Sequence, residues 1–156
     1  METGYSVSEV MVRDVITISP EASLLECAKK MADKKIGCLV VTASTEVIGI
    51  ITEQDLARKV LAREINAKTT KVKEIMSSNI KTISPENDLY SAVQVMGNNE
   101  IKHLPVVIGR KLAGIITAKD IIQIQPGLIE LLRFNTSTNR SESNDNDDDI
   151  DDILLD

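Results

Sequence analysis

The chain has 156 residues, a formal net charge of −6 and an aromatic content of only 2%. This length fits either one compact domain or two small repeated halves. The sequence has no run of about 18 apolar residues, and METGYSVSEV lacks a basic segment followed by an apolar one, which predicts neither a membrane span nor a signal peptide. Two separate thiols, Cys27 and Cys38, predict neither a metal site nor a disulfide framework. We therefore expect a cytoplasmic protein that binds no membrane.

The negative charge is concentrated at the C-terminal end. Residues 135–156 contain eight acidic residues and one arginine, a net charge of −7, which leaves residues 1–134 with a net charge of +1. The stretch NTSTNRSESNDNDDD has no aromatic residue and too little apolar area to offset the entropy lost when a chain becomes ordered. We therefore predict a disordered acidic tail over residues 135–156.

The elements of the first half follow one another in a regular order. A short strand near residues 16–18 is followed by a capping box, Ser23 with Glu26, that opens a helix. Two aliphatic strands come next, at residues 39–42 and 47–51. A second helix begins at Thr52, and its apolar side is predicted to contain Leu56, Val60 and Leu61.

The second half repeats the first. Residues 11–56 align with residues 76–121 at a constant offset of 65 positions without a gap, and 16 positions are identical. Both copies contain Gly-Ile-Ile-Thr-x-x-Asp, and the aliphatic strands of the second copy are predicted at residues 104–108 and 112–116. Such self-similarity predicts a duplicated unit of the order β-α-β-β-α.

The residues after the second copy predict one further element. Pro126 and apolar residues on nearly every turn predict a helix over residues 125–134 that docks on the repeats or on a second copy of the chain. The last residues, 150–156, combine acids with four apolar side chains. Segments of this kind can fold into a groove on another protein, so a partner protein that binds the acidic tail is one expectation.

This ordered pattern resembles a known family. Tandem copies of Met-x-x-x-Val/Ile-x-Thr-x-Ser-Pro, Leu-x-Val-Val and Gly-Ile-Ile-Thr-x-x-Asp are similar to the paired cystathionine-β-synthase (CBS) domains of a Bateman module. The resemblance implies an α/β (α+β) fold in which two β-α-β-β-α repeats, residues 6–65 and 66–124, pack about a pseudo-two-fold axis. It also implies a homodimer.

The Thr-x-x-Asp motif has two interpretations. Thr52 with Asp55, and Thr117 with Asp120, can serve only as helix caps. Alternatively, the Thr hydroxyl lies beside a phosphate at the helix start and the Asp carboxylate accepts from two ribose hydroxyls. The resemblance favours the second interpretation, because in CBS domains that Asp binds ribose and that Thr or Ser lies by the phosphate.

The resemblance also implies two clefts whose residues come from both repeats. One cleft would combine Thr52 and Asp55 with Lys102, His103 and the segment from Ser78 to Ile80. The other would combine Thr117, Lys119 and Asp120 with Gly37, Cys38 and the segment from Arg13 to Val15. Because Gly37 and Cys38 stand where the second copy has Lys102 and His103, we expect the clefts to bind ligand unequally, with the base in an aliphatic slot.

These features predict a regulatory module that senses an adenosine nucleotide of the AMP, ADP or ATP type. Ligand occupancy would reach a partner protein through the relative tilt of the two repeats, since a ligand shifts a conformation only if it binds one state better. No cofactor is expected beyond this regulatory ligand. Catalysis is not expected either, because one histidine and scattered acids form no nucleophile, base or metal constellation.

Two other functions remain open from the sequence. The protein could be a scaffold without a ligand, in which both Thr-x-x-Asp motifs are only caps. It could also bind nucleic acid, because residues 58–73 hold six basic residues against Glu64. The acidic tail and the scarcity of aromatic side chains for base stacking make nucleic acid the less favoured partner.

Overall fold

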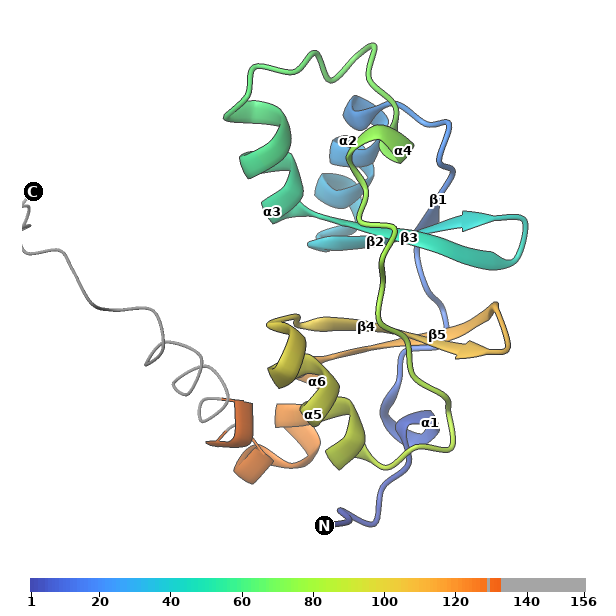
Figure 1. Ribbon diagram of the computed structural model, residues 1–156, viewed down its shortest axis with the longest axis vertical. Coiled ribbons are helices and arrows are strands. Elements are labelled where there is room, and N and C mark those ends of the chain that lie inside the picture. The colour runs from blue at the N-terminus through green and yellow to red at the C-terminus, as the bar shows by residue number, and fades with distance from the viewer. Residues whose placement is uncertain (129, 133–156) are drawn as a thin grey trace, which may run out of the picture.

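The computed structural model describes residues 1–128 and 130–132. The acidic tail predicted at residues 135–156 and the end of the helix predicted at 125–134 lie outside the described residues. Figure 1 shows two stacked halves, each with a β-hairpin facing the other half and helices on its outer side. Within the described residues, no helix has the length and apolar character needed to cross a membrane.

The first repeat has the predicted order of elements. It contains β1 (Thr17–Ile18), α2 (Leu24–Lys34), β2 (Cys38–Ala43) and β3 (Glu46–Thr52). The predicted capping box is confirmed, since the Glu26 amide donates to Ser23 Oγ at 3.1 Å and the Ser23 amide donates to Glu26 Oε2 at 2.8 Å. Helix α2 therefore begins at Leu24, which turns Leu24, Cys27 and Met31 into the core.

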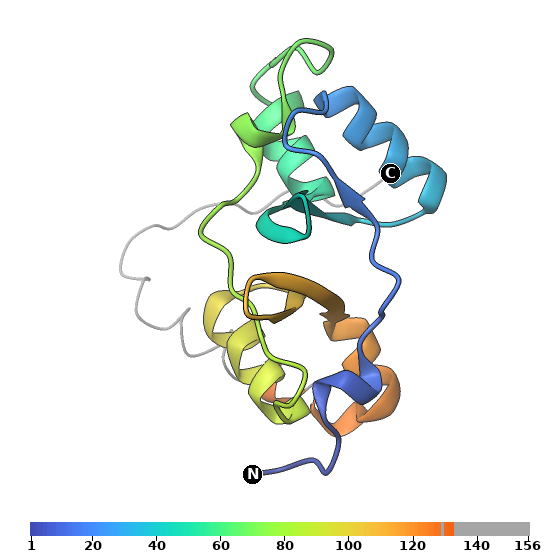
Figure 2. The ribbon, with the colours of Figure 1, turned by 90° about the vertical axis from the view of Figure 1, so that its right-hand side faces the viewer.

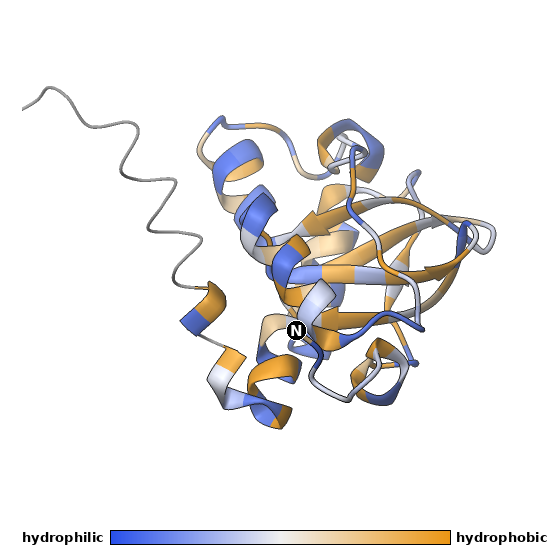
Figure 3. Cartoon of the chain, turned by 60° about the horizontal axis from the view of Figure 1, so that its bottom comes forward, coloured by the Kyte–Doolittle hydropathy of each residue, from blue (hydrophilic) through white to orange (hydrophobic). Residues whose placement is uncertain are grey.

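The second repeat has the same order, but its leading strand is reduced to a single bridge between Ile83 and Val106. It contains α5 (Leu89–Asn99), β4 (His103–Ile108), β5 (Lys111–Thr117) and α6 (Ala118–Ile124). The five strands have the order β1-β2-β3-β5-β4, and the two hairpins are joined by the pair Glu46 and Lys111. Figure 3 shows hydrophobic residues along the strands, with hydrophilic residues on the helices and turns around them. The predicted fold of two β-α-β-β-α repeats about a pseudo-two-fold axis is confirmed.

The helix after the first Gly-Ile-Ile-Thr motif differs from the prediction. It consists of α3 (Glu53–Asp55) and a π-helical segment, η1 (Leu56–Leu61), which ends with a bond from the Ala62 amide to the Ala57 carbonyl. Val60 is buried, but Leu61 is 79% exposed, so its predicted place on the apolar side is wrong. Adjacent helix positions do not share a face, and Val60 takes the position against the core.

The leading segment of each repeat packs into the other half of the molecule. Helix α1 (Val7–Val10) lies beside the second repeat, where the Val7 amide donates to the Asn87 carbonyl at 2.8 Å. Helix α4 (Val72–Ile75) lies beside the first repeat, where the Val72 amide donates to the Ala22 carbonyl at 2.8 Å. Figure 2 shows the two connecting segments crossing between the halves on opposite sides of the molecule.

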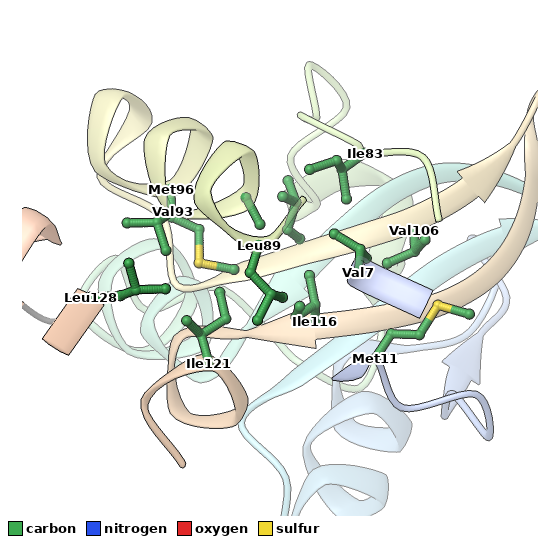
Figure 4. Packing of buried hydrophobic residues seen from close by; sticks show 12 residues of the cluster. Val7, Met11, Ile83, Leu89, Val93, Met96, Val106, Ile116, Ile121 and Leu128 are labelled. Atoms are coloured by element: carbon green, nitrogen blue, oxygen red, sulfur yellow. The ribbon is translucent and has the colours of Figure 1, made fainter. Parts of the chain in front are cut away.

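The two buried clusters follow this exchange. Val7 and Met11 belong to the cluster of the second repeat, with Leu89, Met96 and Ile116 (Figure 4). Leu128, in the short 3-10 helix η2 (Pro126–Leu128), belongs to the same cluster. Val72 belongs to the cluster of the first repeat. Each core is therefore completed by a segment from elsewhere in the chain.

The glycine of each Gly-Ile-Ile-Thr motif makes room for the exchanged segment. A Cβ atom at Gly114 would lie 2.6 Å from Met11 Sδ and 2.8 Å from the Val12 carbonyl oxygen. A Cβ atom at Gly49 would lie 2.5 Å from Met76 Sδ and 3.0 Å from the Ser77 carbonyl oxygen. Two hydrogen bonds between the backbones of Val12 and Ile115, 2.8 and 2.9 Å long, fix the close approach at Gly114.

We predict that Gly114→Ala lowers the free energy of unfolding by about 1–3 kcal/mol, because the new methyl group meets a backbone oxygen that must move. The matched control is Gly127→Ala, since a Cβ there has no heavy atom within 4 Å among the described residues. Chemical denaturation followed by circular dichroism gives both values. Equal stability of the two variants would contradict the close approach at Gly114.

Candidate functional site

Both Thr-x-x-Asp motifs form capping boxes at the ends of strands. The Asp120 amide donates to Thr117 Oγ1 at 3.2 Å, and Asp120 Oδ2 accepts from the Thr117 amide at 3.0 Å and from its hydroxyl at 2.8 Å. The same three bonds link Thr52 and Asp55, at 3.3, 2.9 and 3.2 Å. Both motifs therefore cap the helices that follow them. Each cap uses only Oδ2 of its carboxylate, which leaves Oδ1 for another partner.

Strand pairing brings the start of each hairpin beside the Thr of the same repeat. His103 is paired with Thr117 across β4 and β5, and Cys38 is paired with Thr52 across β2 and β3. The Ala118 amide at the start of α6 donates to the Lys102 carbonyl at 2.9 Å. These bonds hold Lys102 and His103 against the second Thr-x-x-Asp motif.

A cleft of about 410 Å³ opens at this motif. It brings together six of the residues predicted for the second site, namely Val15, Gly37, Cys38, Thr117, Lys119 and Asp120. Its remaining walls are mainly aliphatic and come from both repeats and the connecting segment: Val12, Ile16, Ile36, Ile115 and Ala118. The cleft therefore combines an aliphatic slot with two carboxylates, two lysines and an imidazole.

The structure also shows where the remaining predicted residues lie. Lys102 and His103, predicted for the cleft of Thr52 and Asp55, line the cleft of Thr117 and Asp120. Cys38 lines it too, although strand pairing places Cys38 beside Thr52, so strand pairing alone does not assign a residue to one cleft. Of the predicted segment from Arg13 to Val15, Asp14 and Val15 line the cleft, whereas Arg13 Nη2 donates to the Ser8 carbonyl at 3.0 Å. The segment therefore adds a carboxylate to the cleft.

The first motif has a different environment. Asp55 Oδ1 forms an ion pair with Lys59 Nζ at 2.9 Å, four residues later on the same helix. The equivalent of Lys59 in the second repeat is Ile124, and no cation of the described residues pairs with Asp120. Ser78 is exposed and Ile80 is half-buried, and neither is among the residues that line the described cleft.

The first motif also has an acid where the second has a small residue. Glu53 occupies the position equivalent to Ala118, and a Cβ atom at Gly37 would lie 2.8 Å from Glu53 Oε1. The glycine therefore leaves room for this carboxylate. As a result, the acids Glu53 and Asp55 both stand at the start of α3, whereas α6 has only Asp120 there.

Burial shifts the pKa values of two residues that line the cleft, His103 and Cys38. It lowers the pKa of His103, and Lys102 lowers it further, while Glu53 and Asp120 oppose the change. Burial, reinforced by the charge of Asp55, raises the pKa of the Cys38 thiol to about 12. At neutral pH the imidazole and the thiol are therefore uncharged, and the other ionisable residues that line the cleft are Lys102, Lys119, Asp14 and Asp120. Among the described residues, no group of three or more His, Cys, Asp or Glu side chains could hold a metal ion.

Comparison with known proteins gives consistent matches to this architecture. The family model described as the CBS domain matches residues 7–62 and again residues 72–127. An uncharacterized protein of Methanopyrus kandleri is 41% identical over 128 residues, which cover 81% of this chain and 65% of that protein. The chain thus spans less than two thirds of this relative's length.

Solved structures of CBS proteins have the same fold. A CBS domain pair in complex with 5-methylthioadenosine and S-adenosyl-L-methionine superposes with a TM-score of 0.72 at 28% identity, covering 79% of this chain and 97% of that one. A hexameric CBS-CP12 protein from bloom-forming cyanobacteria superposes with a TM-score of 0.71 at 28% identity, covering 88% of this chain and 83% of that one.

The lowered pKa of His103 predicts a loss of stability in mild acid. Above about pH 6.5 the imidazole is neutral in both states, whereas below it the unfolded chain binds the proton more readily than the folded one. The free energy of unfolding should therefore fall as the pH drops from about 7.5 to 5.5. His103→Gln should flatten this dependence, because the chain has one histidine. Urea denaturation at several pH values measures it, and parallel curves for the two proteins would contradict the assignment.

Proposed function

The chain belongs to the CBS-domain family as a tandem pair, and on this basis we propose that it is a regulatory module that binds an adenosine-containing ligand in the cleft of Thr117 and Asp120. The observation that carries this proposal is the difference between the two carboxylates. Asp55 Oδ1 is paired with Lys59, whereas Asp120 Oδ1 has no cationic partner among the described residues. The second cleft is therefore the one that offers a carboxylate oxygen to a ligand.

The lining of the cleft suits the parts of a nucleoside. Asp120 Oδ1 can accept from the vicinal hydroxyls of a ribose, since a carboxylate oxygen accepts more than one hydrogen bond. The planar base fits against the aliphatic side chains of Ile16, Ile36 and Ile115. A CBS pair of similar structure, which binds 5-methylthioadenosine and S-adenosyl-L-methionine, supports this ligand class.

The charges of the cleft favour a ligand of low net charge. Lys102 and Lys119 attract an anionic group, but Asp14 and Asp120 offset them and His103 is neutral at pH 7. AMP or S-adenosylmethionine should therefore bind more tightly than ATP, whose triphosphate would meet two carboxylates. This order refines the AMP, ADP or ATP class expected from the sequence.

A ligand in this cleft would act on the relative position of the two halves. Its walls come from Ile36–Cys38 in the first repeat, from Lys102 to Asp120 in the second, and from the connecting segment at residues 12–16. A ligand that contacts all three favours the tilt at which they fit it best. We propose that this tilt is transmitted to a partner protein in the cytoplasm and that the module works as a homodimer without catalysing a reaction.

A second candidate function is a scaffold without a ligand. It is favoured by one observation, namely that each Thr-x-x-Asp motif is already satisfied as a helix cap by three hydrogen bonds. In a scaffold these residues would serve only to start α3 and α6. The two functions differ in whether replacing Asp120 affects anything besides stability.

Isothermal titration calorimetry with AMP, ADP, ATP and S-adenosylmethionine tests the proposal. We expect Asp120→Asn to weaken the best ligand by at least about tenfold, the loss of one charge-assisted hydrogen bond. Asp55→Asn is the matched control, because Asp55 occupies the same cap position in the other repeat. The affinity of this variant for the ligand should stay within about twofold of the wild-type value. Equal losses in both variants would contradict the choice of cleft. If the wild-type protein binds none of the four compounds, the scaffold is correct.

A further inference from the structure

The run from Arg58 to Lys73 is the most basic part of the chain, and part of its charge is already paired. Lys59 pairs with Asp55, and Glu21 accepts from Lys71 at 2.6 Å and from Lys73 at 2.8 Å. Three further cations of this run are exposed and have no acidic partner among the described residues, namely Arg58, Arg63 and Lys68. They lie on η1 and on the loop that follows it.

An exposed apolar side chain lies among these cations. Leu61, at the end of η1, is 79% exposed, and among the large hydrophobic residues described as exposed only Met1 exceeds it. The start of this loop is held against η1 by bonds from the Glu64 amide to the Leu61 carbonyl and from the Ile65 amide to the Val60 carbonyl, and its later part is held against α2 by a bond from the Leu25 amide to the Ala67 carbonyl. We refer to Arg58, Leu61, Arg63 and Lys68 as the basic surface. An occupant that matches it needs several acids and at least one apolar side chain.

The end of the chain has this composition. Residues 145–156, DNDDDIDDILLD, contain seven aspartates, two isoleucines and two leucines, and no basic residue. Their negative charge is opposite to that of the basic surface, and their apolar residues lie between the acids. A nucleic acid would match the cations but not Leu61, so the tail is the better complement.

The tail is also long enough to reach this surface. Leu132 is the last residue that the structure describes, and Ile150 lies 18 positions further along the chain. An extended segment of this length spans at most about 60 Å, whereas a domain of this size has a radius of gyration of about 14 Å. Figure 1 shows the end of the described chain and the η1 helix on the same side of the molecule.

We infer that residues 145–156 dock on the basic surface of their own chain, with aspartates beside Arg58, Arg63 and Lys68 and an apolar side chain over Leu61. The ion pairs are exposed and therefore individually weak and screened by salt. The contact is consequently reversible and sensitive to ionic strength. When it forms, the tail covers the surface that would otherwise attract other polyanions.

Paramagnetic broadening in the full-length protein tests this contact. A nitroxide is attached at Asn144→Cys, and native Cys27 and Cys38 should stay unlabelled because both are buried with raised thiol pKa values. At about 50 mM salt we expect the amide signals of residues 58–68 to be lost or weakened. They should recover at about 1 M salt, where the Debye length is about 3 Å.

Charge variants distinguish docking of the tail on the basic surface from nonspecific attraction of the tail to any positive charge on the protein. Arg58→Ser with Arg63→Ser should restore the amide signals at low salt, and Leu61→Ser should restore them in part. The control pair, Lys29→Ser with Lys34→Ser, removes the same charge from the exposed side of α2 and should leave the broadening unchanged.

Four results would overturn the inference. Broadening at Lys102 and Lys119 instead would mean that the tail enters the cleft. Broadening only when the nitroxide is on a different copy would mean that the contact is between chains. Loss of dimer after Leu61→Ser, with unchanged broadening, would make the surface a subunit contact. If no amide in the described residues is broadened, the tail does not dock.

Discussion

Two close contacts, each between a methionine of one repeat and a glycine of the other, are the constraint on which the rest of the structure depends. Met11 lies against Gly114 and Met76 lies against Gly49, so the leading segment of each repeat can approach the last strand of the other half. This approach places Val7 and Val72 in cores that are otherwise formed by distant parts of the chain. It also fixes the connecting segments, one of which forms a wall of the cleft.

The two halves are similar in backbone but differ in the side chains near the Thr-x-x-Asp caps. Both hairpins end in a Thr-x-x-Asp cap, and both caps use one carboxylate oxygen. The difference arises one helical turn later. Lys59 forms an ion pair with Asp55, whereas the equivalent residue in the second repeat is Ile124, which has no charge to pair with Asp120. A single position outside the motif therefore decides whether the motif retains a free acceptor, because an ion pair and a ribose hydroxyl would use the same oxygen.

Local features of the fold were predictable from the sequence, whereas contacts between the copies were not. The capping box at Ser23 and the turn between the strands predicted at residues 104–108 and 112–116 depend on neighbouring residues, and both the helix and the hairpin lie where the sequence indicates. The cleft that Lys102 and His103 line depends on how the two copies face each other, and the offset of 65 residues is the same for either arrangement. Leu61 was misplaced because the π-helical turn and the buried Val60 set its direction.

The exchanged leading segments also relate this chain to a hypothetical chain that has a single repeat. A single repeat on its own would leave its leading helix without the core that buries it, and two separate copies would complete each other as a domain-swapped pair. Joining them by the residues between η1 and α4 makes this pairing independent of protein concentration. Once both copies lie in one polypeptide, each can change alone, and the residues around the two caps can come to differ, as Lys59 and Ile124 do.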